Sequence, residues 1–451
     1  MTAAESVETT EAEPTAEKPS IWRNRDFLRF FAGQFVTNAG DSLYSVAVLW
    51  LVFELSGSTF LTGVANAILL LPWLLQMFAG PLVDRLPLRP VLVGSQVVQG
   101  IVVLVLPLAA ATGHLSVGVI FAVLPILMLA TLPMAPMQAT LVPRIVDDGQ
   151  LSQANSALHT VTLGLDMIFD ALGGAFIAVF GATALFLLDA ATFGVAALLF
   201  AGIVISRGGE ATADRSETAD ADAPTDDGQS LRAVFASYVD DLRAGVDALR
   251  GSAFVPLIAM TAVANLATGV TLAILPAFGD GLGGPALYGL MLGALGIGRL
   301  VGSVVAPYLE GVAYGRLKPV MHTLGACSWL AAAVVPSPAL TVVLFGLAWV
   351  PAGVDGVLTA TLNQTVFPGD LLGRVSSVKG TASGATLPLG SLLGGVVAEL
   401  LGVTTTMALA ALGFGFTGIY FLVRPRLFGL PAVADADRAA FGVTVSDRTE
   451  E

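Results

Sequence analysis

The stretch Leu163–Gly174, which reads LGLDMIFDALGG, places two carboxylates, Asp166 and Asp170, one helical turn apart. Side chains at positions i and i+4 lie on one face of a helix, so the two carboxyl groups are neighbours. When two like charges lie so close in apolar surroundings, one carboxyl group can be ionised while the other keeps a proton. The pair is therefore a candidate site for binding and releasing a proton.

Other ionisable residues also occur within long apolar stretches, and each is predicted to have a function and a partner. They are Asp41, Asp189, Arg299, Asp355 and Lys379. Counting along helices at about 1.5 Å per residue places Asp355 and Lys379 at similar depth, and we expect them, or their close neighbours, to lie within reach of a salt bridge or a bridging water in the inner half of the second bundle. Asp189 is predicted to make a hydrogen bond between helices.

The composition indicates that these residues lie in membrane-spanning helices. Of the 451 residues, 55% are hydrophobic and 12% charged, with a mean hydropathy of +0.81. A soluble domain carries about twice that share of charged residues. Apolar blocks of about 20 residues are predicted to cross a membrane. The predicted spans are 27–53, 59–83, 89–112, 115–141, 151–179, 182–206, 253–278, 285–309, 319–335, 339–366, 375–401 and 404–423.

The distribution of Lys and Arg predicts the orientation of the chain in the membrane. Of the 21 Lys and Arg residues, all but Arg299 and Lys379 fall at one set of loops and in the two ends of the chain. This predicts a multi-pass plasma-membrane protein with both termini in the cytoplasm. The polar, acidic start lacks the basic region and apolar run of a signal peptide.

Several classes of function have no support in the sequence. The net charge of −13 and the lack of a basic surface argue against nucleic acid as a partner. A single cysteine excludes disulfides within the chain, and the three histidines have no metal-binding spacing. No phosphate-binding motif of the form G-x-x-x-x-G-K-[ST] and no convincing catalytic constellation occur, so we expect neither an enzyme nor ATP-driven transport.

The chain divides into two similar halves of six predicted spans. GPLVDRLPLRPV follows the second span and APYLEGVAYGRLKPV the eighth, while DALGG in the fifth span corresponds to SLLGG in the eleventh. The predicted parts are a disordered acidic tail (1–26), a six-helix bundle (27–206), a linker with an amphipathic helix (207–252), a second bundle (253–423) and a cytoplasmic tail (424–451). Two such halves are typical of transporters, which bind substrate between them near the membrane midplane.

The chain resembles a known family, the major facilitator superfamily. Residues 80–89, GPLVDRLPLR, are similar to the family signature G-x-L-x-D-R-x-G-R-R, with departures at Pro87 and Leu88. Four other parts of the chain resemble the branch of this family that exports drugs, macrolides and siderophores. They are the first predicted span, which contains NAGD, and the segments LFLLDAATF, ILPAF and GRVSSV. The resemblance implies an all-α integral membrane fold of twelve transmembrane helices in two pseudo-symmetric bundles.

The resemblance also implies roles for particular residues. Helices 1, 4, 7 and 10 of the family line a central cavity, so Asp41 and Asp355, together with Lys379, are candidate substrate-cavity residues. Helix 5 of the family packs beside helix 8, which would place Asp166 and Asp170 opposite Arg299. A carboxylate–arginine cluster at the cytoplasmic helix ends can latch one conformation. The residues assigned to this latch and its second copy are Gly80, Asp84, Arg85, Arg89, Glu310, Arg316, Lys318 and Arg374.

These features predict a proton-coupled exporter of amphipathic or drug-like small molecules, acting as a monomer in the lipid bilayer without a cofactor. The antiporter branch usually carries G-P-x-x-G-G in helix 5, but Phe169 and Asp170 stand at the Gly-Pro positions here. The helix 5 carboxylates therefore carry the proton or form a structural pair with Arg299. Sodium coupling, an uptake permease or facilitator, and a non-transporting receptor or scaffold stay open as alternatives.

Overall fold

The computed structural model describes residues 20–72, 75, 87–204, 239 and 242–443, and for residues 148, 159–167, 369 and 370 it describes the backbone alone. Within these residues the chain is almost wholly helical, and the one β-bridge joins Ala313 to Ala432. The predicted latch residues Gly80, Asp84 and Arg85 lie outside the described residues. The predicted amphipathic helix also lies largely outside them, although residues 242–249 are helical.

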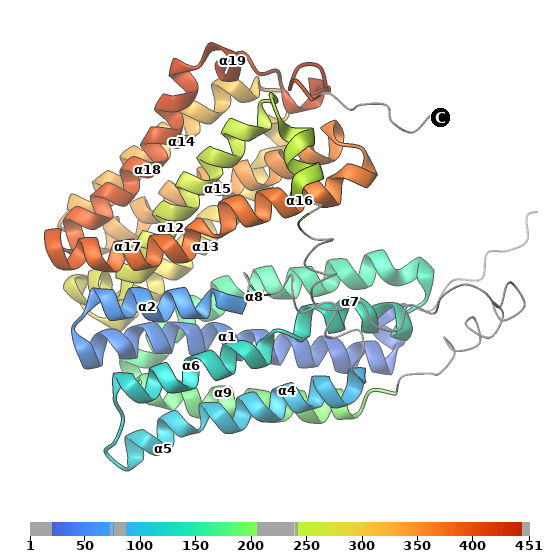
Figure 1. Ribbon diagram of the computed structural model, residues 1–451. Helices are drawn as coiled ribbons and strands as arrows, with labels where there is room; N and C mark the ends of the chain where they lie inside the picture. Colours follow the sequence, from blue (N-terminus) through green and yellow to red (C-terminus); the bar gives the residue numbers. More distant parts are fainter. Residues whose placement is uncertain (1–19, 73–74, 76–86, 205–238, 240–241, 444–451) are drawn as a thin grey trace, which may run out of the picture.

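The amino-terminal half forms the lower bundle of Figure 1. Its first helix begins after Asn24, whose side chain accepts hydrogen bonds from the backbone N–H groups of Asp26 and Phe27, as expected of an N-cap. That helix ends at Gly57, where φ is 63°. The elements are η1 (Ile21–Arg23), α1 (Arg25–Ser56), α2 (Thr59–Leu69), α4 (Leu88–Val103), α5 (Val105–Ala111), α6 (Val117–Thr131), α7 (Met134–Ile145), η2 (Asp148–Gln150), α8 (Leu151–Phe180) and α9 (Ala182–Ala201).

The carboxy-terminal half forms the upper bundle of Figure 1. Its elements are α12 (Phe254–Leu282), α13 (Pro285–Val305), η4 (Ala306–Leu309), α14 (Tyr314–Val334), α15 (Pro338–Val366), α16 (Gly369–Gly384), α17 (Thr386–Leu401), α18 (Val403–Val423), α19 (Pro425–Phe428) and η5 (Val433–Asp435). The two halves repeat one arrangement: α1, α4 and α6–α7 are the first, third and fourth helical segments of one bundle, and α12, α14 and α15 are those of the other.

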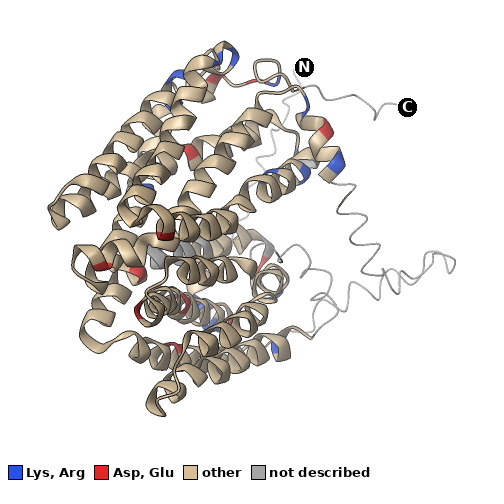
Figure 2. Cartoon of the chain, turned by 60° about the vertical axis from the view of Figure 1, so that its left-hand side comes forward, with Lys and Arg blue, Asp and Glu red and all other residues tan. Residues whose placement is uncertain are grey.

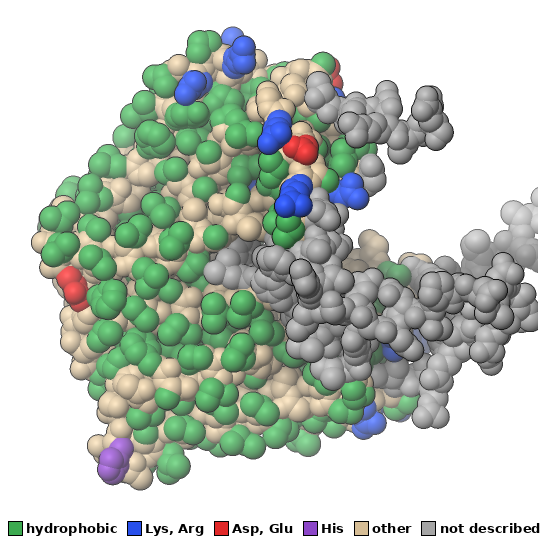
Figure 3. Space-filling model, viewed as in Figure 1, with side chains coloured by type: hydrophobic (Ala, Val, Ile, Leu, Met, Phe, Trp, Pro, Cys, Tyr) green, Lys and Arg blue, Asp and Glu red, His purple; other side chains and the backbone are tan. Residues whose placement is uncertain are grey.

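The outer surface suits a lipid environment. Nine helices or joined helix pairs of the described chain are long and apolar enough to cross a membrane. Large apolar side chains such as Leu198 and Leu400 are 77% and 76% exposed, and hydrophobic side chains cover most of the face in Figure 3. Such a surface would be costly in water but not in hydrocarbon. The chain is therefore an integral membrane protein, and the exact number of twelve crossings stays a prediction.

The two bundles contact each other through glycine-rich helix crossings at one end of the molecule. α8 packs against α13, and α2 packs against α17. A Cβ atom added to Gly174 would overlap the backbone of Gly289, and one added to Gly63 would overlap the carbonyl oxygen of Ser391. Glycines allow such close helix approach in membranes. From this end the long axes of the two bundles diverge in Figure 1.

Basic residues such as Arg29 and Arg89 lie at the opposite end of the molecule. Arg29 donates a hydrogen bond to the carbonyl oxygen of Gly202, and Arg89 donates one to that of Ala201. Both bonds tie a helix start to the end of α9. Figure 2 shows few charged residues along the middle of the helices.

Part of the predicted carboxy-terminal tail packs against the second bundle instead of extending away from it. Phe441 is 1% exposed, and its carbonyl oxygen accepts a hydrogen bond from Ala253 N–H at 2.8 Å. Pro431 accepts from Tyr314 N–H at 3.0 Å, and Ala434 donates to the carbonyl oxygen of Glu310 at 3.1 Å. This segment therefore joins the starts of α12 and α14 at the basic end.

Candidate functional site

Each bundle contains a cavity, and the two cavities occupy equivalent places. The cavity of the first bundle is lined from α1, α4, α6 and α7, and that of the second is lined mainly from α12 to α16. Their water-accessible volumes are about 190 and 150 Å³. Because α1, α4 and α6–α7 correspond to α12, α14 and α15 in the two halves, the cavities follow the internal repeat of the chain.

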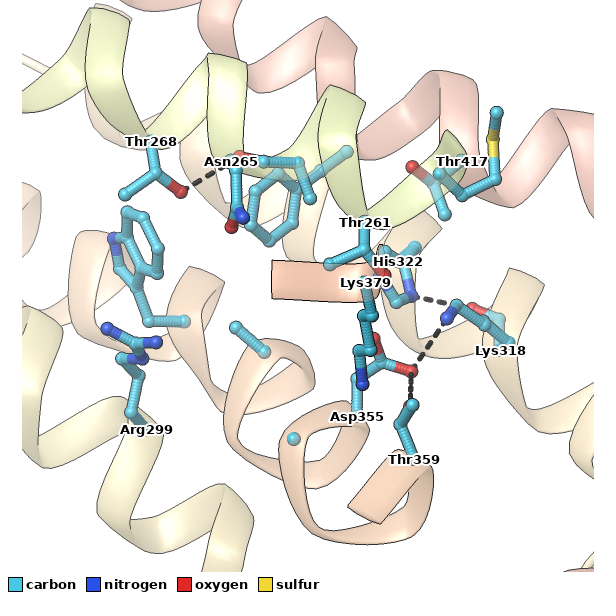
Figure 4. Close-up of a pocket in the computed structure, with 16 residues that line it drawn as sticks. Thr261, Asn265, Thr268, Arg299, Lys318, His322, Asp355, Thr359, Lys379 and Thr417 are labelled. Carbon is cyan, nitrogen blue, oxygen red and sulfur yellow. Dashed lines mark hydrogen bonds and ion pairs between the residues drawn. The ribbon is translucent and has the colours of Figure 1, made fainter. Parts of the chain in front are cut away.

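A buried ion pair forms one wall of the second cavity, shown in Figure 4. Lys318 of α14 donates to Asp355 of α15 over 2.7 Å, and their side chains are 3% and 21% exposed. The same oxygen, Asp355 Oδ1, accepts a hydrogen bond from Tyr314 at 2.9 Å and one from Thr359 at 3.4 Å. Lys318 also donates to the Tyr314 hydroxyl over 3.1 Å. A buried charge pair is tolerated when further hydrogen bonds satisfy it, as they do here.

This pair corrects one sequence assignment. Lys318 was assigned to a latch in the loop between two spans. In the structure α14 begins at Tyr314, five residues before the predicted span, so Lys318 lies inside the helix and 4% exposed. Tyr314 and Lys318 stand at i and i+4 and therefore share the helix face that meets α15. The i, i+4 spacing of Tyr314 and Lys318 is the sequence feature that could have predicted this hydrogen-bond network around Asp355.

Lys379 and Arg299 line the same cavity, from α16 and α13. Figure 4 shows Arg299 at one side of the space and the joined Asp355, Lys318 and Thr359 at the other. Arg299 reaches this position because α13 crosses α15 closely: a Cβ atom on Gly353 would overlap the Arg299 carbonyl oxygen. Lys379 thus lies in the cavity with Asp355 as the sequence predicted, while the ion pair of Asp355 is with Lys318.

The first cavity is lined by amides, hydroxyls and one carboxylate. Asp41, a predicted cavity residue, lines it together with Asn38 and Gln99. Gln34 and Gln138, on α1 and α7, are joined by a hydrogen bond of 2.7 Å. This cavity offers hydrogen-bond donors and acceptors and has an acidic group, whereas the second cavity carries several basic groups.

Asp189 has surroundings that the sequence did not predict. It is 1% exposed on α9, and its Oδ1 accepts a hydrogen bond from Thr192 of the same helix at 3.2 Å. Its Oδ2 has no hydrogen-bond partner within the described part of the chain. The expected bond to another helix is therefore replaced by one within α9. Gly40 of α1 packs directly on this carboxyl group.

The predicted contact between the fifth and eighth helices is present in the structure, where α8 packs against α13. The helices are antiparallel, since Gly174 meets Pro285 and Gly289 while Gly289 also meets Ala171. Counting from the Gly174–Gly289 crossing at about 1.5 Å per residue brings Asp166 to within ~3 Å of the level of Arg299, and Asp170 to within ~9 Å. The Asp166 side chain is not described, so its pairing with Arg299 stays a prediction that this register favours over Asp170.

The latch also stays a prediction for most of its members. Arg89 lies in the first turn of α4 and bonds the end of α9. Glu310 and Arg316 flank the start of α14, and Arg374 lies on α16, where its carbonyl group meets Gly245 of the linker. Lys318 is the exception, because it belongs to the buried pair.

Comparisons with known proteins agree with this architecture. A model of the Major Facilitator Superfamily matches residues 30–384. The multidrug efflux pump Tap of Mycolicibacterium fortuitum is 28% identical over 407 residues, which cover 86% of this chain and 93% of the pump. Tap of Mycobacterium tuberculosis is 24% identical over 424 residues, with 92% and 97% covered.

Solved structures with a similar fold have low sequence identity to this chain. The nucleoside transporter NupG superposes with a TM-score of 0.62 at 12% identity, covering 88% of this chain and 99% of its own. A bacterial homologue of the human lysosomal transporter Spinster, in an inward-facing and occupied conformation, has a TM-score of 0.62 at 12% identity, with 91% and 97% covered. These similarities concern the fold alone.

Proposed function

The chain belongs to the major facilitator superfamily, and on this premise we propose that it exports amphipathic small molecules in exchange for protons. Membership in a family of transporters makes it a membrane-spanning transporter and not an enzyme. The observation that carries the direction of transport is the similarity to proteins named multidrug efflux pumps, which extends over 86% of this chain and 93% of one such pump.

The geometry supports transport by alternating access. The bundles are joined by close glycine crossings at one end, where a small rotation of one bundle against the other would break or form the contacts. A cavity in each half lies at equivalent positions, as expected for a substrate site between repeated bundles. The substrate would then contact both halves and be exposed to each side of the membrane in turn.

A proton gradient is the proposed energy source, and no cofactor is needed. Asp166 and Asp170 are the proposed coupling carboxylates, because both lie on α8, which packs against the opposite bundle. A carboxyl group at such an interface can gain and lose a proton as the bundles move. Sodium would use the same carboxylates and is the other outcome of the test below.

We also propose that the protein resides in the plasma membrane as a monomer with both termini in the cytoplasm. The support for this orientation is the basic end of the molecule, where Arg29 and Arg89 bond the end of α9. Basic residues accumulate on the cytoplasmic side of membrane proteins.

Purified protein in lipid vesicles would test the proposed function. Fluorescent amphipathic dyes of cationic, neutral and anionic charge are offered under an imposed pH gradient, an imposed sodium gradient, or neither. Proton-coupled export predicts uphill dye movement with the pH gradient alone, and loss of that movement when an ionophore collapses the gradient. Movement that follows only the dye gradient would indicate a facilitator, and failure to move any dye would overturn the proposal.

A further inference from the structure

The cavity of the second bundle has more positive than negative side chains. Its lining includes Arg299, Lys318, Lys379 and one carboxylate, Asp355. Asp355 is engaged by Lys318, Tyr314 and Thr359. The other ionisable group of the lining is His322, whose Nδ1 lies 3.0 Å from the Lys318 carbonyl oxygen. One carboxylate therefore faces two basic side chains beyond its own partner.

Within the described part of the chain, the side chains of Arg299 and Lys379 make no hydrogen bond or ion pair, and the nearest opposite charge acting on Lys379 is that of Asp355, which is already bonded to Lys318. Positive charges within a membrane protein are costly unless a partner of opposite charge lies near. A guanidinium group binds a carboxylate or phosphate group through two parallel hydrogen bonds, and an ammonium group adds three more donors. The two side chains together have the chemistry of an anion-binding site.

The rest of the lining would accommodate an apolar body. Trp349, Phe414 and Met260 border the same cavity, and Trp349 and Phe414 have ring centroids 5.6 Å apart. Small-molecule sites in proteins are mostly apolar walls with a few polar groups that orient the ligand. Neutral polar groups such as Thr261 and Asn265 supply further hydrogen bonds along one side.

From this arrangement we propose that the second cavity binds the acidic group of an amphipathic organic anion. Arg299 and Lys379 hold the carboxylate, sulfonate or phosphate group, and the aromatic wall contacts the apolar part. The Lys318–Asp355 pair is a fixed wall of the site. This inference rests on the proposed function and names the class of substrate, since it states which charge the transported molecule carries.

Three probes that share one ring system would test this site: pyrenebutyric acid, its neutral amide, and pyrenebutylamine. Binding to the purified protein is measured by energy transfer from tryptophan to pyrene. The anion is expected to bind about tenfold or more tightly than the amide, which is the factor expected for a charge-assisted hydrogen bond. Equal binding of the anion and the amide would overturn the inference.

Substitutions then assign the charge preference to residues. Arg299→Gln and Lys379→Gln are each expected to weaken binding of the anion about tenfold or more and to leave binding of the amide within about twofold. Arg299→Lys and Lys379→Arg keep the charge and should retain a preference for the anion. Arg250→Gln is the matched control, because Arg250 lies on the surface with a side chain 77% exposed, and it should change neither affinity.

Two further outcomes would count against the site. If Arg299→Gln and Lys379→Gln lower all three affinities together, the loss is structural and the assignment fails. If Asp166→Asn strengthens anion binding while Arg299→Gln has no effect, Arg299 serves the contact between the bundles instead of the ligand. Size-exclusion profiles of each variant identify those that do not fold, and the charge-conserving variants then decide.

Transport separates this inference from the proposed function. If vesicles move the amide or the amine against its gradient while the anion is not preferred, the charge assignment fails and export stands. If the anion is bound with the expected preference but no probe is transported, the site stands and the proposed export fails.

Discussion

The buried pair of Lys318 and Asp355 gives a test of how this bundle tolerates charge, because its two members are buried to different extents. Their side chains are 3% and 21% exposed. Removing one partner of a buried pair costs about 3–5 kcal/mol, since the other charge is left without compensation. We expect the two single substitutions to differ, with Asp355→Asn the more destabilising.

The difference follows from what each variant leaves behind. In Asp355→Asn, the Lys318 ammonium group still has neutral acceptors, the new amide oxygen and the Tyr314 hydroxyl at 3.1 Å. It no longer has a negative charge beside it, so we expect a loss of about 3 kcal/mol. In Lys318→Met, Asp355 keeps the hydrogen bonds from Tyr314 and Thr359. It also faces the cavity, where Lys379 is present. That loss should be about 1–2 kcal/mol.

Chemical unfolding of the purified protein in detergent, followed by tryptophan fluorescence, measures these differences. The double variant Lys318→Met with Asp355→Leu should recover to within about 1 kcal/mol of wild type, because no charge is left unpaired. Arg316→Met is the control, since this exposed residue of the same helix loses the same charge and should change stability by less than about 0.5 kcal/mol. A Lys318→Met variant that is less stable than Asp355→Asn would refute the reasoning from burial.

Three further variants test the moving parts. Asp84→Asn should leave the protein folded in the membrane but slow transport strongly if the predicted latch operates; normal turnover would contradict the latch. Gly174→Val should prevent the close crossing with Gly289 and so disfavour the conformation closed at that end, measured as increased labelling of a cysteine placed there; unchanged labelling would argue against a role for this crossing. Asp170→Asn should uncouple transport from a pH gradient more than Asp166→Asn, because Asp166 lies nearer the level of Arg299 and is its expected ion-pair partner, which leaves Asp170 to gain and lose the proton; equal activity of both variants with wild type would leave these carboxylates with a structural role.

Much of this protein could be predicted from its sequence because a membrane imposes simple constraints. Backbone groups must bond within a helix in hydrocarbon, so apolar stretches of sufficient length become helices. The helical segments, the division into two halves and the family followed from that pattern and from short motifs such as Gly80–Arg89. The residues of the candidate cavities, Asp41, Asp355 and Lys379, were also found, because ionisable side chains within apolar segments are rare.

The partners of those residues were decided by the tertiary structure alone. The sequence predicts that Lys318 lies in a loop and does not pair it with Asp355. Because α14 starts early and packs against α15, the Lys318 ammonium group and the Asp355 carboxylate lie 2.7 Å apart. Arg299 similarly lines the second cavity because α13 crosses α15 at glycines whose closeness depends on both helices. Hydropathy determines that a segment is a helix, but the rotation of a helix about its axis depends on the surfaces of its neighbours, and that rotation decides which charges meet.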